Sequence, residues 1–213
     1  MSGRPAFDLS VYVVTDTEMC GRRGVVATVR AAVAGGASMV QLRDPSATDD
    51  DLIRLGRELC AELAGTDVPL LVNDRVDLVA AIGAAGAHVG QGDTSPSEAR
   101  AVLGRDALLG LSVQSVEHVR AAAGADVDYL GVGPVWTQAT KTDAAVPCGP
   151  AGLRAIVRAS PWPCVAIGGI DETRAAAVRA TGASGVAVVS AVCAARDPRA
   201  ATAALRAVWT AAA

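Results

Sequence analysis

The stretch that decides the fold runs from Leu70 to Asp93 and has the sequence LLVNDRVDLVAAIGAAGAHVGQGD. It contains two short apolar runs, Leu70–Val72 and Ala87–Val89, and small or acidic polar residues follow each run at once. An amphipathic segment lies between the two runs. This pattern predicts a strand, a helix and a second strand parallel to the first. One carboxylate, Asp74 or Asp93, would then lie just beyond the end of each strand.

The same alternation of apolar runs and helical segments extends along the whole chain. Strands alternating with helices imply parallel pairing. Eight such units without a linker predict one domain over residues 1–213, an α/β fold of the closed (β/α)8 TIM-barrel type. An open doubly wound sheet is the alternative, but no G-x-G-x-x-G follows the first strand to support it. The predicted strands begin at Val11, Met39, Leu70, Ala87, Leu108, Tyr129, Cys164 and Val186.

Composition supports this fold class and argues against several functions. The chain is 51% hydrophobic but only 3% aromatic, as expected for a parallel sheet and helices packed through Val, Leu, Ile and Ala. The net charge is −3 and no Lys/Arg run is present, so we expect no nucleic acid partner. No apolar run reaches membrane-spanning length and MSGRPAFDLS lacks a signal-peptide core, so we expect a cytoplasmic protein without a membrane partner. A homo-oligomer is compatible with the sequence, which leaves the oligomeric state open.

The cysteines and histidines do not predict a zinc site. The five cysteines are scattered without C-x-x-C spacing, and neither of the two histidines lies near a cysteine pair. We therefore expect reduced thiols that mainly fill the core.

Polar residues follow the predicted strands at the points where the strands end. In a (β/α)8 barrel these ends meet at one rim, which carries the active site. Agreement among seven strands is stronger evidence than any single residue. The residues expected at the rim are Arg43, Asn73, Asp74, Gln91 to Asp93, Ser112, Thr140, Lys141, Gly168, Gly169 and Ser190.

The residue types predict two anionic ligands. Glycines and helix starts after the last two strands form the usual phosphate site of this fold. On the other side of the rim, Asp74 and Asp93 would bind a phosphate badly without a cation between them. Mg²⁺ takes a few carboxylates together with phosphate oxygens, and Arg43 and Lys141 would help it to neutralise a pyrophosphate.

The charged candidates also have structural interpretations. Asp74 and Asp93 could cap the helices that follow them. Arg43 could pair with a neighbouring carboxylate, Asp44 or Asp16, and Lys141 could be a solvated loop charge.

The remaining candidates have similar alternatives. Ser112 could be bonded to the backbone, and Gly168–Gly169 could be only a tight turn. His88 is expected to be structural or to orient substrate rather than to act as a base, and His118 is expected at the surface. Trp136 could line a pocket or anchor the long loop from Gly133 to Pro147.

Taken together, these residues resemble the thiamine phosphate synthase family, also called thiamine-phosphate pyrophosphorylases. The central stretch and the VGP…TK loop are specific to the family, whereas VAIGGI is common to many phosphate-binding barrels. The similar segments cover nearly the whole chain in order: VYVVTD (Val11 to Asp16), VQLRD (Val40 to Asp44), Leu70 to Asp93, LGLSVQS (Leu109 to Ser115), DYLGVGPVWTQATKTDA (Asp128 to Ala144), VAIGGI (Val165 to Ile170) and GVAVVSAV (Gly185 to Val192).

The resemblance implies a Mg²⁺-dependent transferase of thiamine biosynthesis. Its small-molecule substrates would be 4-amino-2-methyl-5-pyrimidinylmethyl diphosphate and a thiazole phosphate, and its products thiamine phosphate and pyrophosphate. Arg43, Lys141 and Ser112 would be the catalytic residues. The implied pyrimidine contacts are Gln41, Arg43, Asn73, Ser112 and Lys141; the metal ligands are Asp74 and Asp93; and the thiazole-phosphate contacts are Thr140, Gly168 or Gly169, Val189 and Ser190.

Two positions depart from the family pattern. Pro45 stands where the family usually has a lysine, so Arg22 or Arg23 would have to replace that cation. Gln138 stands where a threonine is common. The rival interpretations are a thiazole tautomerase-like paralogue without the pyrophosphate machinery and a non-catalytic barrel that binds a phosphate ligand. Asp74, Asp93 and Lys141 argue against the paralogue.

Overall fold

A computed structural model describes residues 3–137 and 146–210, which form a closed barrel of eight parallel strands in sequence order. The last strand pairs with the first through Val186 opposite Val11 and Val188 opposite Val13. The predicted (β/α)8 barrel is therefore confirmed, and the open doubly wound sheet is wrong. The strands are β1 (Val11–Val14), β2 (Met39–Leu42), β3 (Leu70–Asn73), β4 (Gly86–Val89), β5 (Leu108–Val113), β6 (Tyr129–Val132), β7 (Cys164–Ile167) and β8 (Gly185–Val188).

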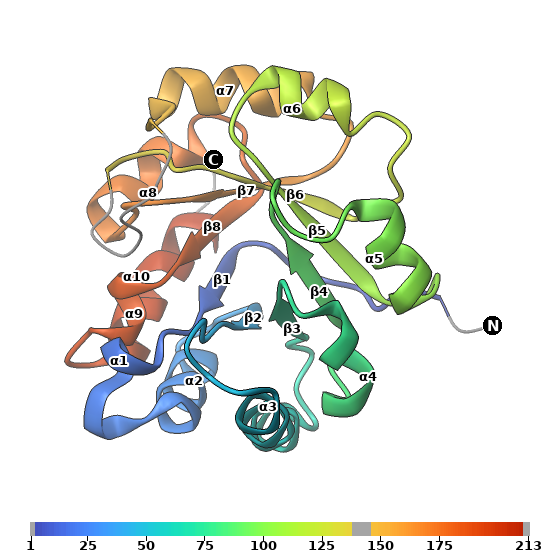
Figure 1. The fold of residues 1–213 in the computed structure, drawn as a ribbon. Coiled ribbons are helices and arrows are strands. Elements are labelled where there is room, and N and C mark those ends of the chain that lie inside the picture. The colour runs from blue at the N-terminus through green and yellow to red at the C-terminus, as the bar shows by residue number, and fades with distance from the viewer. Residues whose placement is uncertain (1–2, 138–145, 211–213) are drawn as a thin grey trace.

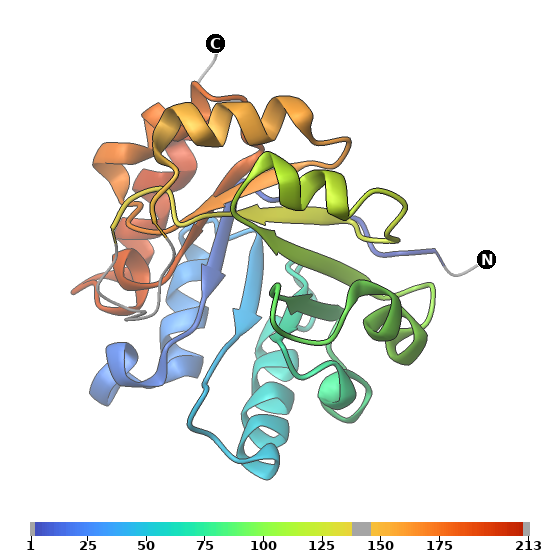
Figure 2. The same cartoon turned by 45° about the horizontal axis from the view of Figure 1, so that its top comes forward.

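Helices surround the strands on the outside of the barrel (Figures 1 and 2). Within the described ranges, no helix is long and apolar enough to span a membrane. The helices are α1 (Thr17–Cys20), η1 (Gly21–Arg23), α2 (Val25–Ala34), α3 (Asp49–Leu63), η2 (Val76–Leu78), α4 (Val79–Ile82), α5 (Pro96–Leu103), α6 (Val116–Ala121), α7 (Gly149–Ala159), α8 (Glu172–Arg179), α9 (Ser190–Cys193) and α10 (Pro198–Thr210), where η marks a 3-10 helix.

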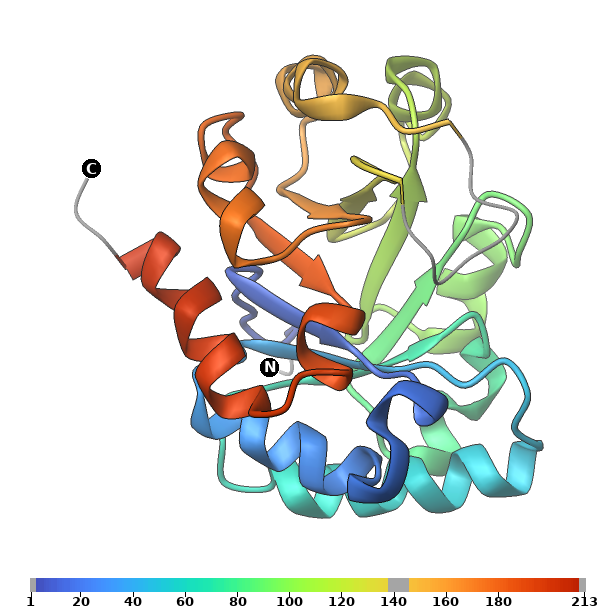
Figure 3. The same ribbon diagram turned by 90° about the vertical axis from the view of Figure 1, so that its left-hand side faces the viewer.

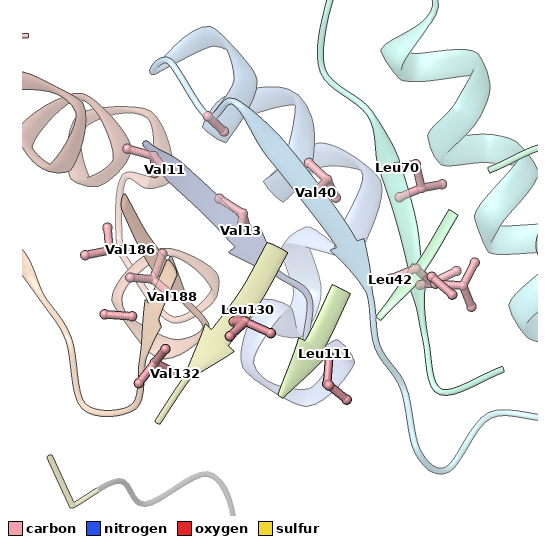
Figure 4. Close-up of a cluster of buried hydrophobic side chains, with 14 of the residues drawn as sticks. Val11, Val13, Val40, Leu42, Leu70, Leu111, Leu130, Val132, Val186 and Val188 are labelled. Atoms are coloured by element: carbon pink, nitrogen blue, oxygen red, sulfur yellow. The ribbon is translucent and has the colours of Figure 1, made fainter. Parts of the chain in front are cut away.

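The strands bury both of their faces, which explains their continuous apolar runs. Side chains alternate along a strand, so one set points toward the helices and the other into the barrel. Val11 and Val13 belong to the outer set (Figure 4). This set forms one cluster with helix residues such as Val29. Tyr12 and Val14 belong to a separate inner cluster made from the strands and the segment before them. The inner set is the one that reaches the barrel mouth.

Side-chain caps start several helices close to the carboxyl ends of the strands. Ser95 and Glu98 form a reciprocal capping box on α5, with Pro96 in its first turn. Asp171 accepts hydrogen bonds from two backbone N–H groups of α8. The predicted helix between β3 and β4 is divided instead into η2 and α4, after Asp74 has turned the chain at φ +59°.

The ends of the chain fasten the barrel from outside. Helix α10 packs against α2 and α8, so the last helix lies beside a helix from the start of the chain (Figure 3). Near the amino ends of β5 and β6, Arg4 forms ion pairs with Asp126 (2.6 Å) and Asp128 (2.7 Å), and Arg100 also contacts Asp128 (3.2 Å). These ion pairs lie away from the carboxyl-end rim, where this fold carries its active sites.

Candidate active site

Two cavities open at the carboxyl ends of the strands. The first has a volume of about 420 Å³, and its lining includes Gln41, Arg43, Asn73, Asp74, Asp93, Ser112 and Val189. The second has a volume of about 370 Å³, and its lining includes Gly168, Gly169, Val189 and Ser190. The predicted residues therefore divide between two neighbouring sites. Thr140 and Lys141 lie outside the described residues, as do Gln138 and most of the long loop from Gly133 to Pro147.

Asp74 and Asp93 face the same cavity from neighbouring strand ends. The side-chain amide of Asn73 donates a hydrogen bond to Asp74. One carboxylate oxygen of Asp93 accepts the backbone N–H of Gly90 at 2.8 Å. Neither aspartate caps the following helix, because η2 begins without a side-chain cap and Ser95 caps α5. The capping interpretation of both aspartates is therefore wrong.

The donor set of this cavity fits Mg²⁺ better than a metal held entirely by protein. Among residues 3–137 and 146–210, no group of three or more His, Cys, Asp or Glu side chains could hold a metal ion. Mg²⁺ needs no such group, since one or two carboxylates, water and substrate phosphates complete its coordination. Asp74 and Asp93 are the two carboxylates that could hold it.

Arg43 lines the first cavity and forms no ion pair with a carboxylate in the described part of the chain. Its backbone N–H donates to the Thr15 hydroxyl at 2.9 Å, which holds the end of β2 against β1. Asp44 instead accepts the hydroxyl of Thr17 at 2.6 Å, and Asp16 caps α1. Pairing of Arg43 with Asp44 or Asp16 is therefore wrong, and its guanidinium remains beside the cavity.

The nearby arginines do not replace the cation missing at Pro45. Arg23 donates hydrogen bonds to the carbonyls of Ala195 and Arg196, both at 3.0 Å. Neither Arg22 nor Arg23 is among the residues lining the two cavities.

Five polar side chains form a continuous chain across the barrel interior beneath the first cavity. Gln41 Nε2 donates to the Tyr12 hydroxyl at 2.6 Å, and the Tyr12 and Tyr129 hydroxyls are 3.0 Å apart. The Tyr129 hydroxyl lies 3.0 Å from His88 Nδ1, and His88 Nε2 lies 2.8 Å from Ser112 Oγ. The backbone-bonded interpretation of the Ser112 hydroxyl is therefore wrong, because its partner is an imidazole. We name these five residues the interior polar chain.

Burial sets the protonation of the interior polar chain. It lowers the pKa of His88 to about 4, and the negative charge of Asp93 offsets only part of this effect. Burial also raises the pKa values of Tyr12 and Tyr129 above their ordinary range. At neutral pH the imidazole is therefore neutral and both phenols keep their protons. This supports the expectation that His88 is structural or orients substrate.

The second cavity lies at a glycine turn after β7. Gly168 and Gly169 both adopt positive φ, at +102° and +65°. A Cβ on Gly169 would lie 2.8 Å from the Thr137 carbonyl oxygen and 2.9 Å from Trp136 Cβ. Glycine is thus required here both for the turn and for the close approach of the two loops.

Arg174, which the sequence analysis did not identify, lies at the second cavity. It is the only Lys or Arg in the described lining. Its guanidinium lies 5.2 Å from the centre of the Trp136 ring and donates to the carbonyl of Gly169. Trp136 is not among the residues that line either cavity, and its ring contacts Arg174 instead. Tyr12 and Tyr129 were also missed, although strand alternation places both on the inward face.

The structure thus defines a (β/α)8 barrel with two cavities side by side at the barrel mouth. Comparison with known proteins identifies the family. The sequence model of a family described as thiamine monophosphate synthase matches residues 11–192. The chain belongs to the thiamine monophosphate synthase family.

Curated relatives and a solved structure agree with this assignment. The chain is 48% identical over 191 residues to the thiamine-phosphate synthase of Azorhizobium caulinodans, covering 90% of each chain. It is 48% identical over 206 residues to the thiamine-phosphate synthase of Xanthobacter autotrophicus, covering 97% of this chain and 98% of the relative. A solved thiamine phosphate pyrophosphorylase from Pyrococcus furiosus superposes with a TM-score of 0.86 at 38% identity, covering 94% of this chain and 95% of that one.

Proposed function

We propose that the protein joins 4-amino-2-methyl-5-pyrimidinylmethyl diphosphate to a thiazole phosphate and releases thiamine phosphate and pyrophosphate. The observation that carries this proposal is that the two cavities adjoin: Ile167, Ala187 and Val189 line both of them. Two separately anchored anionic substrates could therefore meet at the shared wall. Membership in the family supports the same reaction.

The first cavity would bind the pyrimidine diphosphate. Gln41 and Ser112 offer polar groups to the ring from opposite sides of the barrel, and Arg43 and Asn73 lie close enough to the rim to meet the diphosphate. Lys141 is assigned to the diphosphate from the family resemblance alone. Asp74 and Asp93 would hold Mg²⁺, which when bound neutralises charge on the diphosphate oxygens.

The second cavity would bind the thiazole phosphate. Gly168 and Gly169 allow a phosphate to approach the backbone, and Val189 and Ser190 lie across the cavity from them. Arg174 adds a positive charge on the same side. Thr140 belongs to this set through the family resemblance. The substrate is hydroxyethylthiazole phosphate or its carboxylated form.

The proposed mechanism is dissociative. The C–O bond of the pyrimidinylmethyl group breaks, and pyrophosphate leaves with the electron pair. Arg43 and Lys141 stabilise the charge that grows on the departing oxygens. The aminopyrimidine supports the resulting cation, and the lone pair of the thiazole nitrogen then forms the new C–N bond. No base is required for this step, which suits a site whose buried histidine is neutral. Positioning the two substrates supplies much of the rate.

A coupled assay tests this function directly. Both substrates are incubated with the enzyme, with and without Mg²⁺, and thiamine phosphate and pyrophosphate are measured together. We expect equal amounts of the two products, and only when Mg²⁺ is present. Conversion of the thiazole without pyrophosphate release would instead favour the tautomerase-like alternative. Binding of thiamine phosphate without turnover would favour the non-catalytic alternative.

A further inference from the structure

The interior polar chain joins two residues on opposite walls of the first cavity. Gln41 lies on β2 and Ser112 on β5, and the other three members lie on the strands between or beside them. Tyr12, Tyr129 and Gln41 are 1%, 0% and 5% exposed, so water does not compete for these hydrogen bonds. Buried networks of this kind are strengthened by their low-dielectric surroundings. The two ends of the chain therefore cannot orient independently of each other.

The Gln41 donor sets one consistent direction for the hydrogen bonds of the interior polar chain. Gln41 Nε2 can only donate, so the Tyr12 oxygen accepts from it, and the Tyr12 hydroxyl is then left to donate to the Tyr129 oxygen. Tyr129 then donates to His88 Nδ1. A neutral imidazole that accepts at Nδ1 carries its hydrogen on Nε2, so His88 donates to Ser112 Oγ. If the Gln41 amide were turned over, every one of these bonds would reverse.

We propose that Tyr12 and Tyr129 are positioning residues that transmit the orientation of the Gln41 amide to the tautomer of His88 and the hydroxyl of Ser112. In the orientation observed, Gln41 keeps its carbonyl oxygen as the acceptor available to a ligand. Ser112, which already accepts from His88, offers its hydrogen as a donor. The cavity is thereby specific for a heterocycle that presents an amino donor toward β2 and a ring acceptor toward β5. The inferred specificity for a heterocycle rests on the proposed function, whereas the inferred tautomer of His88 does not.

The strands leave space for this chain and for little else. A Cβ on Gly110 would lie 2.2 Å from Tyr129 Cζ and 2.4 Å from His88 Nδ1. A Cβ on Gly131 would lie 2.9 Å from His88 Cε1. Phe7 packs against Tyr129, with ring centroids 5.9 Å apart. Packing thus fixes the positions of the tyrosine and imidazole rings. Only the positions of the hydroxyl and ring hydrogens can still vary.

Nitrogen-15 NMR of histidine-labelled protein tests the proposal. The protein has two histidines, so a His118→Gln variant assigns the His88 signals. At neutral pH we expect the Nε2–H tautomer of His88 in the wild-type protein and a mixture of both neutral tautomers in Tyr129→Phe. A wild-type Nδ1–H tautomer, or a tautomer that Tyr129→Phe leaves unchanged, would overturn the proposal.

A variant at the far end of the chain gives a sharper test. Gln41→Glu replaces the donor amide by a carboxylate, which can only accept from Tyr12. Every hydrogen bond of the interior polar chain should then reverse its direction, and His88 should change to the Nδ1–H tautomer. Adding Tyr12→Phe should break the connection and prevent the change. Retention of the Nε2–H form in Gln41→Glu, or the same signal with and without Tyr12, would contradict transmission through the tyrosines.

Kinetics separate positioning from general damage. Tyr129→Phe should raise KM for the pyrimidine diphosphate about tenfold, the effect of losing one buried hydrogen bond and the order that it imposes. KM for the thiazole phosphate should not change. Thr202→Val is the matched control, because it removes another fully buried hydroxyl, bonded to the Pro198 carbonyl on α10. Equal changes in both KM values would contradict the proposal, while absence of turnover in the wild-type protein would refute the proposed function and leave the NMR result standing.

Discussion

The two cavities at the barrel mouth are similar in size but are built in different ways. The first, of about 420 Å³, is lined by carboxylates, amides, hydroxyls and an arginine from the inward faces of the strands and the loops that follow them. The second, of about 370 Å³, is lined mostly by glycine, small and aliphatic residues at the ends of β7 and β8, together with Asp171 and Arg174. We therefore expect the first cavity to depend mainly on side-chain charge and the second mainly on the shape of the glycine turn. We expect that removing charge damages the first, whereas adding a single methyl group damages the second.

The largest effect should come from Asp93 in the charge-dependent cavity. Asp93→Ala removes one of the two carboxylates proposed to hold Mg²⁺, so leaving-group stabilisation is lost and kcat should fall about 1,000-fold. The rate of pyrophosphate release measures this. An unchanged rate at saturating Mg²⁺ would remove Asp93 from the metal site.

Asp93→Asn is the matched control for the loop. It retains an acceptor for the Gly90 N–H, at 2.8 Å from the carboxylate in the wild-type protein, but removes the charge. We expect Asp93→Asn to lose nearly as much activity as Asp93→Ala. If it kept wild-type activity, the role of Asp93 would be to close the Gly90–Asp93 turn.

The second effect is on the free energy of unfolding. It concerns only the first cavity, because His88 lines that cavity. The folded-state pKa of His88 is about 4, below its ordinary value of 6.5, because the ring is buried. The unfolded chain therefore takes up a proton below about pH 6.5 that the folded protein does not, and stability is lost as the pH falls through this window. The loss should reach about 3 kcal/mol near pH 4. Urea unfolding at several pH values measures it.

A His88→Gln variant separates the loss of stability caused by His88 from the loss caused by protonation of the carboxylates. Asp8, Asp44 and Asp171 have lowered pKa values that also favour the folded state at neutral pH, but they are present in both proteins. The variant should be the less acid-sensitive of the two between about pH 6.5 and pH 4. Identical pH dependence would mean that His88 is protonated in the folded protein.

The sequence was sufficient to predict the barrel, and the predicted rim residues that the structure describes lie at two cavities. Strand alternation and helix caps are local signals, and in this chain they agree with the tertiary packing. Asp171, for example, follows a glycine turn and caps α8 as its sequence position predicts. The helix between β3 and β4 was the exception, because its start depends on the left-handed turn at Asp74.

The contacts within each site were harder to predict, because they join residues far apart in sequence. Tyr12 and Tyr129 are 117 positions apart, and only the closed barrel brings their hydroxyls together. Arg174 lies on the first turn of α8, where a surface position is the ordinary expectation, and its role depends on Trp136 in another loop. The assignments of Thr140 and Lys141 remain predictions.

The third effect tests the second cavity. Gly169→Ala forces alanine into positive φ and places its Cβ within 2.9 Å of two neighbours. KM for the thiazole phosphate should rise about tenfold, while KM for the pyrimidine diphosphate should stay within about twofold of wild type. Steady-state kinetics with each substrate varied in turn measures this. A rise confined to the pyrimidine would reverse our assignment of the two cavities.

Gly104→Ala is the control for backbone strain alone. Gly104 ends α5 at φ +75°, and its added Cβ would meet no heavy atom within 4 Å. This variant should lose about 1 kcal/mol of stability and keep both KM values. A similar kinetic change in both variants would mean that strain, rather than crowding of the cavity, explains the effect at Gly169.

The smallest effect should come from Arg174, the basic side chain in the described lining of the second cavity. Arg174→Met keeps much of the aliphatic stem over Trp136 but removes the guanidinium, so KM for the thiazole phosphate should rise about fivefold as one charge-assisted contact is lost. Arg154→Met, on an exposed position of α7, controls for the change in net charge and should have no effect. If the increase disappears at high salt, Arg174 acts through long-range attraction. If it persists, the guanidinium contacts the substrate directly, and the second cavity then combines backbone shape with one specific side chain.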